Sequence, residues 1–217
     1  MLCGKCVEAC AYDALAVLGR SVAVEEIMEL LEADRKFFSD QGGLTISGGE
    51  PLAQPEACIH LAAEAKGRGF HVCLDTSGYA ERKVVEEVAP FVDLFLYDIK
   101  LTNEEDHIRY TGVSNQVILE NLDWLCMHQY GIILRCPIIP DVNDDDLHLQ
   151  RITDLSNRYD SVREVNLMFY HDMARNKVQQ IGFAGELLIR ETIKKERKQE
   201  LNRRIRSMGC KKLNENA

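Results

Sequence analysis

The amino-acid sequence predicts an α/β fold in which parallel strands form a barrel or part of one. Short apolar runs rich in β-branched and aromatic residues alternate with longer amphipathic stretches, which is the pattern of right-handed βαβ units. The short runs are nearly continuous in apolar character, as expected for strands covered on both faces. Polar residues follow each run, and a barrel gathers ligand contacts from every strand end, whereas an open sheet concentrates them at one point.

An amphipathic helix is expected first, over residues 22–40, and five strands alternating with helices follow it. The strands are expected at 44–47, 70–74, 94–97, 132–136 and 165–169. The helices between them are expected at 55–69, 81–91, 114–131 and 144–160. Gly69 and Gly131 lie where helix C-termini favour glycine. Five strands do not close a barrel, and proteins generally cover open sheet edges, so we expect a strand to be missing in front.

Composition limits the classes of function. The 217 residues suit one globular domain or one and a half. A net charge of −9, from 26 basic and 35 acidic side chains, argues against general nucleic-acid binding. No stretch approaches the roughly 20 apolar residues that span a bilayer, and no export signal precedes the first cysteines. Cys58, Cys73, Cys126 and Cys136 are expected to be small buried hydrophobes of a protein in the reducing cytoplasm.

Three cysteines at the N-terminus form a candidate metal site. Cys3, Cys6 and Cys10 are spaced C-x2-C-x3-C, which matches the last three ligands of the bacterial ferredoxin pattern C-x2-C-x2-C-x3-C-P. Ala11 replaces the usual proline, and the first ligand of the pattern would precede Met1. The alternatives are free surface thiols or a zinc site, but zinc sites usually have a second cysteine pair, which this sequence lacks. We therefore predict part of an iron–sulfur ligand set.

The residues at the strand ends form a candidate cofactor site. They are Gly48, Gly49, Glu50, Asp75, Thr76, Asp98, Lys100, Arg135 and His171. Glycines without a Cβ let a ligand approach the backbone. Asp75 and Asp98 end neighbouring strands, so their carboxylates are expected to converge. An unpaired guanidinium in an apolar strand is costly, so we expect Arg135 to meet a carboxylate or a ribose. Ordinary alternatives stay open: a tight turn with a solvated Glu50, strand-end capping, a solvated lysine and a plain loop histidine.

Five segments together carry a family resemblance: LTISGGEPL, CLDTSG, LYDIK, LRCPIIP and MFYHDM, in this order. They resemble the glycyl-radical-enzyme activating enzymes of the radical SAM superfamily, in the pyruvate formate-lyase activating enzyme-like subgroup with a ferredoxin-like insert. The resemblance implies a partial (β/α)6 barrel and a C-x3-C-x2-C loop that holds a [4Fe–4S] cluster. This sequence contains no C-x3-C-x2-C. We therefore expect a fragment without the first strand, in which 1–20 is the remnant of the insert and 21–217 the partial barrel.

The resemblance also implies roles for individual residues. Gly48, Gly49 and Glu50 would bind the methionine ammonium of S-adenosylmethionine. Asp75, Thr76 and Asp98 would hold a monovalent cation beside the cofactor, a role that suits hard oxygen ligands. Lys100 would neutralise a carboxylate of the cofactor or of a neighbouring aspartate. Arg135 would contact a carboxylate or the ribose, and His171 would pack on the adenine.

The activity implied is the activation of a glycyl radical enzyme such as pyruvate formate-lyase. A reduced cluster would cleave S-adenosylmethionine, and the 5′-deoxyadenosyl radical would take hydrogen from a glycine of the partner, with flavodoxin or ferredoxin as electron donor. Cys3, Cys6 and Cys10 would serve an auxiliary electron-relay cluster. The chain by itself is expected to be inactive. The alternatives are another radical SAM enzyme acting on a peptide or small molecule, and a non-catalytic iron–sulfur electron carrier.

Two charged segments have more ordinary interpretations. The acidic stretch DVNDDD (141–146) is able to bind a metal, but we expect it to cap the following helix, since acidic residues at a helix start favour the helix dipole. The basic stretch 193–212 is expected to form a helix. It would dock an acidic surface of a partner or, by default, remain a solvated amphipathic helix.

Overall fold

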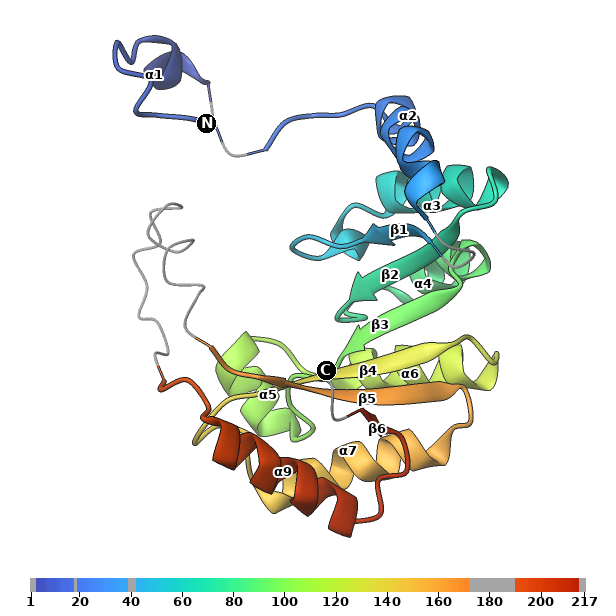
Figure 1. Ribbon diagram of the computed structural model, residues 1–217, viewed down its shortest axis with the longest axis vertical. Helices are drawn as coiled ribbons and strands as arrows, with labels where there is room; N and C mark the ends of the chain where they lie inside the picture. Colours follow the sequence, from blue (N-terminus) through green and yellow to red (C-terminus); the bar gives the residue numbers. More distant parts are fainter. Residues whose placement is uncertain (1–2, 18, 39–41, 172–189, 215–217) are drawn as a thin grey trace.

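The computed structural model describes residues 3–17, 19–38, 42–171 and 190–214. Its centre is one six-stranded sheet in the order β1-β2-β3-β4-β5-β6, and every neighbouring pair is parallel. Figure 1 shows the strands fanning out as a curved sheet. The strands are β1 (Gly43–Ile46), β2 (His71–Thr76), β3 (Leu94–Asp98), β4 (Ile132–Ile138), β5 (Val162–Phe169) and β6 (Leu213–Asn214). The predicted partial barrel of parallel strands is confirmed.

Helices connect successive strands, as right-handed crossovers require. The α-helices are α1 (Lys5–Glu8), α2 (Val24–Asp34), α3 (Pro55–Gly67), α4 (Arg82–Val88), α5 (Glu104–Thr111), α6 (Gln116–Met127), α7 (Asp146–Arg158) and α9 (Lys195–Ser207). Short 3-10 turns are η1 (Arg35–Phe37), η2 (Pro51–Ala53) and η3 (Ala89–Phe91). In the described part of the chain, no helix has the length and apolar character needed to cross a membrane.

Two helices and one strand are additional to the sequence prediction, and the first of them is the short helix α1. Helix α5 was not predicted because it is short and mostly polar, although Asn103 caps it by accepting a hydrogen bond from the Asp106 N–H at 3.0 Å. Strand β6 was not predicted because only two residues pair with β5. Helix α2, which corresponds to the helix expected over 22–40, is shorter than expected and is followed by the η1 turn.

One face of the sheet is fully buried and the other is only half-buried. Along β4, alternate residues from Ile132 to Ile138 are 0% exposed, whereas Ile133 and Arg135 are half-buried. The same alternation runs along β2 and β3. The prediction of strands covered on both faces therefore holds for the helix-covered face only. The half-buried face lines the hollow of the partial barrel, so side chains there remain accessible to a ligand.

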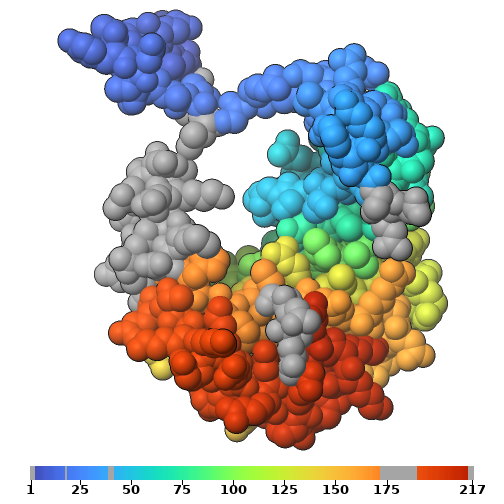
Figure 2. Space-filling model, in the orientation of Figure 1, coloured from blue at the N-terminus to red at the C-terminus, as the bar shows by residue number. Residues whose placement is uncertain are grey.

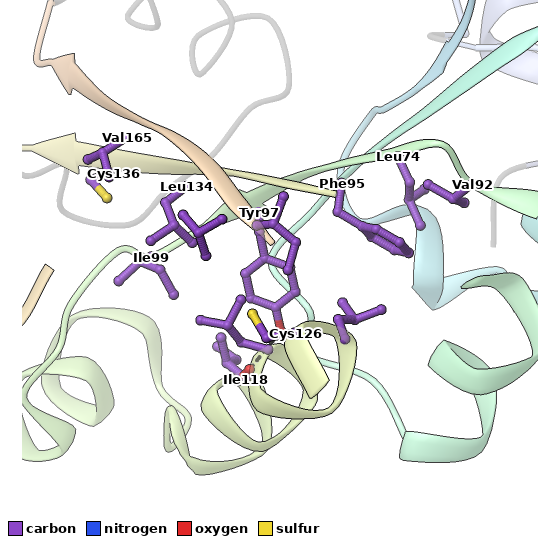
Figure 3. Close-up of a cluster of buried hydrophobic side chains, with 14 of the residues drawn as sticks. Leu74, Val92, Phe95, Tyr97, Ile99, Ile118, Cys126, Leu134, Cys136 and Val165 are labelled. Carbon is purple, nitrogen blue, oxygen red and sulfur yellow. Dashed lines mark hydrogen bonds between the residues drawn. The ribbon is translucent and has the colours of Figure 1, made fainter. Parts of the chain in front are cut away.

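Tyr97 links the buried face to α6. Figure 3 shows its ring pointing from β3 toward the helix, beside Ile118 and Cys126. The Tyr97 hydroxyl donates a 2.6 Å hydrogen bond to the Ile118 carbonyl. A Cβ on Gly78 would lie 1.8 Å from this hydroxyl, and Gly78 has a φ of +71°, so only glycine fits the turn after β2. Burial raises the pKa of the Cys126 thiol to about 11, consistent with its predicted role as a small hydrophobe.

The acidic and basic segments meet each other. Asp145 caps α7 by accepting from the His148 N–H at 3.0 Å, as predicted for this stretch. Asp144 pairs with Arg197 at 2.7 Å, and Asp146 with Arg204 at 2.6 Å. Helix α9 therefore docks on the acidic stretch of its own chain and is not merely solvated. Its apolar residues, which include Leu201 and Ile205, are 0% exposed.

Because His148 is buried, we expect the stability of the protein to depend on pH. The side chain is 4% exposed, and its Nδ1 accepts a 3.3 Å hydrogen bond from the Thr102 N–H, so the ring is held neutral. Burial lowers the pKa of His148 to about 4, below the value of roughly 6.5 for an unfolded chain. At pH values between these two pKa values, His148 is protonated in the unfolded state and neutral in the folded state. His148 should therefore make folding less favourable by about 2 kcal/mol at pH 5 than at pH 7.

Urea unfolding of the wild type and of His148→Gln at both pH values measures this effect. The variant should lose most of that pH dependence, while His60→Gln, at an exposed histidine of α3, should keep it. Equal pH dependence in the wild type and His148→Gln would contradict the assignment.

Candidate functional site

A polar pocket of about 190 Å³ lies at the carboxyl ends of β1 to β4. It is lined by Ser47, Gly48, Gly49, Glu50, Asp75, Thr76, Ser77, Asp98, Lys100 and Arg135. Eight of the nine strand-end residues singled out from the sequence are among them. The parallel register brings them together, because the carboxyl ends of parallel strands lie at one edge of the sheet. The candidate site is therefore built from four consecutive strand ends.

Two carboxylates and two cations balance one another in this pocket. Asp98 and Arg135 are register partners on β3 and β4. The Arg135 side chain reaches across β3, where its Nη1 lies 2.6 Å from Asp75 Oδ1 and its Nε lies 4.0 Å from Asp98 Oδ1. Lys100 Nζ lies 3.0 Å from Asp98 Oδ2. The predicted convergence of the two aspartates and the carboxylate partner of Arg135 are thus present in the structure.

Serines complete the pocket that the sequence analysis described only in part. The Ser47 hydroxyl donates to Asp75 Oδ2 at 2.9 Å, and the Ser77 hydroxyl donates to Glu50 Oε2 at 2.6 Å. Each serine directly precedes a glycine in a strand-end loop, as SGG or SGY. This adjacency was the available signal, but serines are common in loops, and only the hydrogen bond to a carboxylate that lines the pocket distinguishes these two.

Glu50 joins the loop after β1 to the turn after β2. Its Oε1 accepts from the Leu52 N–H at 3.1 Å and from the Thr76 hydroxyl at 2.6 Å. Its Oε2 accepts from the Ser77 N–H at 2.9 Å as well as from the Ser77 hydroxyl. The glycines before it leave room for a ligand: Gly48 has a φ of +138°, and a Cβ built on Gly49 would have no neighbour within 4 Å.

On the β5 side, the predicted residue His171 does not line the pocket, whereas Asn166, which was not predicted, pairs in register with a residue that does. His171 follows β5, is exposed and is not among the residues that line the pocket. Asn166 was not singled out, yet it is the register partner of Arg135. Its buried Oδ1 makes no hydrogen bond within the described residues. The available signal was a lone amide in the apolar strand VNLMF.

The N-terminal cysteines lie on and around the short helix α1. Figures 1 and 2 show this segment apart from the sheet, joined to α2 by extended chain. The Ala14 N–H donates to Cys10 Sγ at 3.3 Å, and backbone hydrogen bonds, led by that of Tyr12, lower the pKa of Cys10. A thiolate is the form that binds iron. Over the described ranges, however, no three His, Cys, Asp or Glu side chains gather as a metal site.

Comparisons with known proteins agree on one family. The model of the Radical SAM superfamily matches residues 5–150. The chain is 38% identical to choline trimethylamine-lyase activating enzyme of Oleidesulfovibrio alaskensis, over 79% of this chain and 56% of the relative. It is also 38% identical to (2S)-3-sulfopropanediol dehydratase activating enzyme of Klebsiella oxytoca, over 78% and 55%. The chain thus spans a little more than half the length of these curated relatives.

A solved structure gives the same picture. A domain of pyruvate-formate lyase-activating enzyme from Bacteroides vulgatus aligns with a TM-score of 0.65 and 26% sequence identity, covering 80% of this chain and 98% of that domain.

Removing the guanidinium of Arg135 tests the charge balance of the pocket. Arg135→Gln leaves the Asp75 and Asp98 carboxylates with one cation fewer. We expect the free energy of unfolding to fall by about 1 kcal/mol, because the pair is partly exposed, and added salt to recover part of the loss by screening the carboxylates. Thermal unfolding over a series of salt concentrations measures both. Arg163→Gln, at an exposed position of β5, is the control, and equal behaviour of the two variants would refute the charge balance.

Proposed function

The chain belongs to the radical SAM superfamily, and on this premise we propose that its strand-end pocket binds S-adenosylmethionine for the activation of a glycyl radical enzyme. The observation that carries the proposal is the convergence of eight family-type residues from four strand ends into one polar pocket. The curated relatives named above are activating enzymes, which supports the same assignment.

The charges of the pocket fit the charges of the cofactor. S-adenosylmethionine carries a carboxylate, an ammonium and a sulfonium. Arg135 and Lys100 offer donors to a carboxylate, and Asp75 and Asp98 offer acceptors to positive groups. Gly48 and Gly49 allow the ligand to approach the backbone. We also propose that Asp75, Thr76 and Asp98 provide the oxygen ligands of a monovalent cation once Arg135 releases its carboxylates.

The described pocket accounts for binding and orientation. Together with a reduced [4Fe–4S] cluster, bound S-adenosylmethionine supplies the one-electron chemistry that removes hydrogen from a glycine. The 217 residues contain no C-x3-C-x2-C sequence, so the ligands of that cluster are not among them. We therefore propose that this chain by itself binds the cofactor without cleaving it.

The partner and the electron route are part of the proposal. The relatives are named for a lyase and a dehydratase, so we propose a glycyl radical enzyme of this broad kind as the protein substrate. Flavodoxin or ferredoxin would supply the electron. Residues 1–20 would belong to a ferredoxin-like insert in which Cys3, Cys6 and Cys10 ligate an auxiliary cluster, in the cytoplasm, where thiols stay reduced. A simple electron carrier would need only the cysteines and leaves the pocket without a role.

Calorimetric titration with S-adenosylmethionine tests the binding step. Asp98→Asn should weaken binding about tenfold, because a charge-assisted contact is lost. Asp160→Asn, at an exposed turn before β5, should bind as the wild type does.

Anaerobic assays test the reaction. The chain alone should release no 5′-deoxyadenosine, and a complete enzyme with verified clusters should release it and produce a glycyl radical signal on its partner. A complete enzyme that binds no cofactor and forms no 5′-deoxyadenosine would refute the proposed function.

A further inference from the structure

We propose that Glu50 is a positioning residue: it fixes the turn after β2 through Thr76 and Ser77 and does not itself receive the ammonium of the ligand. The inference rests on the proposed function for the identity of the ligand. It replaces the role implied for Glu50 by family resemblance with one drawn from its contacts. It also assigns positioning roles to Thr76 and Ser77.

The Glu50 carboxylate has no free acceptor site for a ligand. An ionised carboxylate has about four lone-pair sites for hydrogen bonds. Glu50 receives donors at 3.1 and 2.6 Å on Oε1 and at 2.9 and 2.6 Å on Oε2, from Leu52, Thr76 and Ser77. All of its acceptor sites are occupied by this chain. A ligand ammonium would have to displace one of these donors, which leaves a pocket-lining polar group unsatisfied.

The turn after β2 is held by hydrogen bonds from both sides. On the core side, Asn121 Nδ2 donates 2.9 Å hydrogen bonds to the carbonyls of Gly78 and Ala80. The Thr76 hydroxyl, which donates to Glu50, also accepts from the Gly78 N–H at 2.9 Å. The turn therefore has a fixed position between Asn121 and Glu50.

The position of the turn after β2 controls the position of the Asp75 carboxylate. Asp75 lies directly before the turn, and its carboxylate meets Arg135 at 2.6 Å and Ser47 at 2.9 Å. A shift of the turn moves Asp75 along with it. Glu50 thus acts on the ligand through the Asp75 carboxylate. The ligand ammonium is left to the acceptors that the pocket offers elsewhere.

Hydrogen exchange tests the positioning role without a ligand. In Ser77→Ala and Glu50→Gln, the amides of Ser77 and Gly78 should exchange about tenfold faster. The Ser77 amide donates to Glu50, and the Gly78 amide donates to the Thr76 hydroxyl that Glu50 holds, so both lose support when the contacts of Glu50 are weakened. Ser77→Thr keeps the hydroxyl and should restore slow exchange. Glu81→Gln, at an exposed glutamate beside the same turn, is the matched control. Unchanged exchange in both Ser77→Ala and Glu50→Gln would overturn the inference.

A ligand comparison separates positioning from direct contact. Calorimetry is performed with S-adenosylmethionine and with its analogue in which hydrogen replaces the α-amino group. If Glu50 positions the turn, Glu50→Gln weakens both ligands by the same factor, and Ser77→Ala does so to a smaller extent. If Glu50 receives the ammonium, the analogue is insensitive to Glu50→Gln, and the inference fails. Should the wild type bind neither ligand, the proposed function fails at this site, and the exchange data alone decide the role of Glu50.

Discussion

The parallel pairing of all six strands is the constraint on which the rest of the molecule depends. Parallel strands need a crossover after each strand, so a helix follows almost every one and covers the same face of the sheet. The loops that leave the strands then all lie at one edge. Residues far apart in sequence, such as Asp75 and Arg135, are therefore in direct contact there.

Charge pairing organises the pocket at that edge. The Arg135 guanidinium spans from β4 to Asp75 on β2, and Lys100 meets Asp98 on the strand between. Asp75 and Asp98 are therefore each compensated by a cation before any ligand arrives, and these pairs are accessible enough for water to moderate their strength. In the proposed function, the charged groups of the ligand would replace partners within these internal pairs.

The acidic stretch after β4 and the basic helix α9 stabilise the packing of the C-terminal part of the chain. Asp144 and Asp146, which follow β4, hold Arg197 and Arg204 of α9. This contact fixes the C-terminal helix against α7, and β6 then adds to the edge of β5. The acidic stretch 141–146 therefore caps α7 and also binds the basic helix α9 of the same chain. The basic side chains of α9 that make these ion pairs contact their own chain.

The sequence by itself determined the alternation of strands and helices, the strand ends that carry the site and the glycines beside Glu50, because periodicity and composition are local properties of the chain. It missed α5, whose apolar content is low, and β6, which exists only because β5 offers an edge. Only the tertiary structure decided that Arg135 pairs with Asp75, that Ser77 holds Glu50, that Asn166 lies beside the pocket and that His171 lies outside it. Those contacts depend on strand register and sheet curvature, and no local pattern in a sequence encodes them.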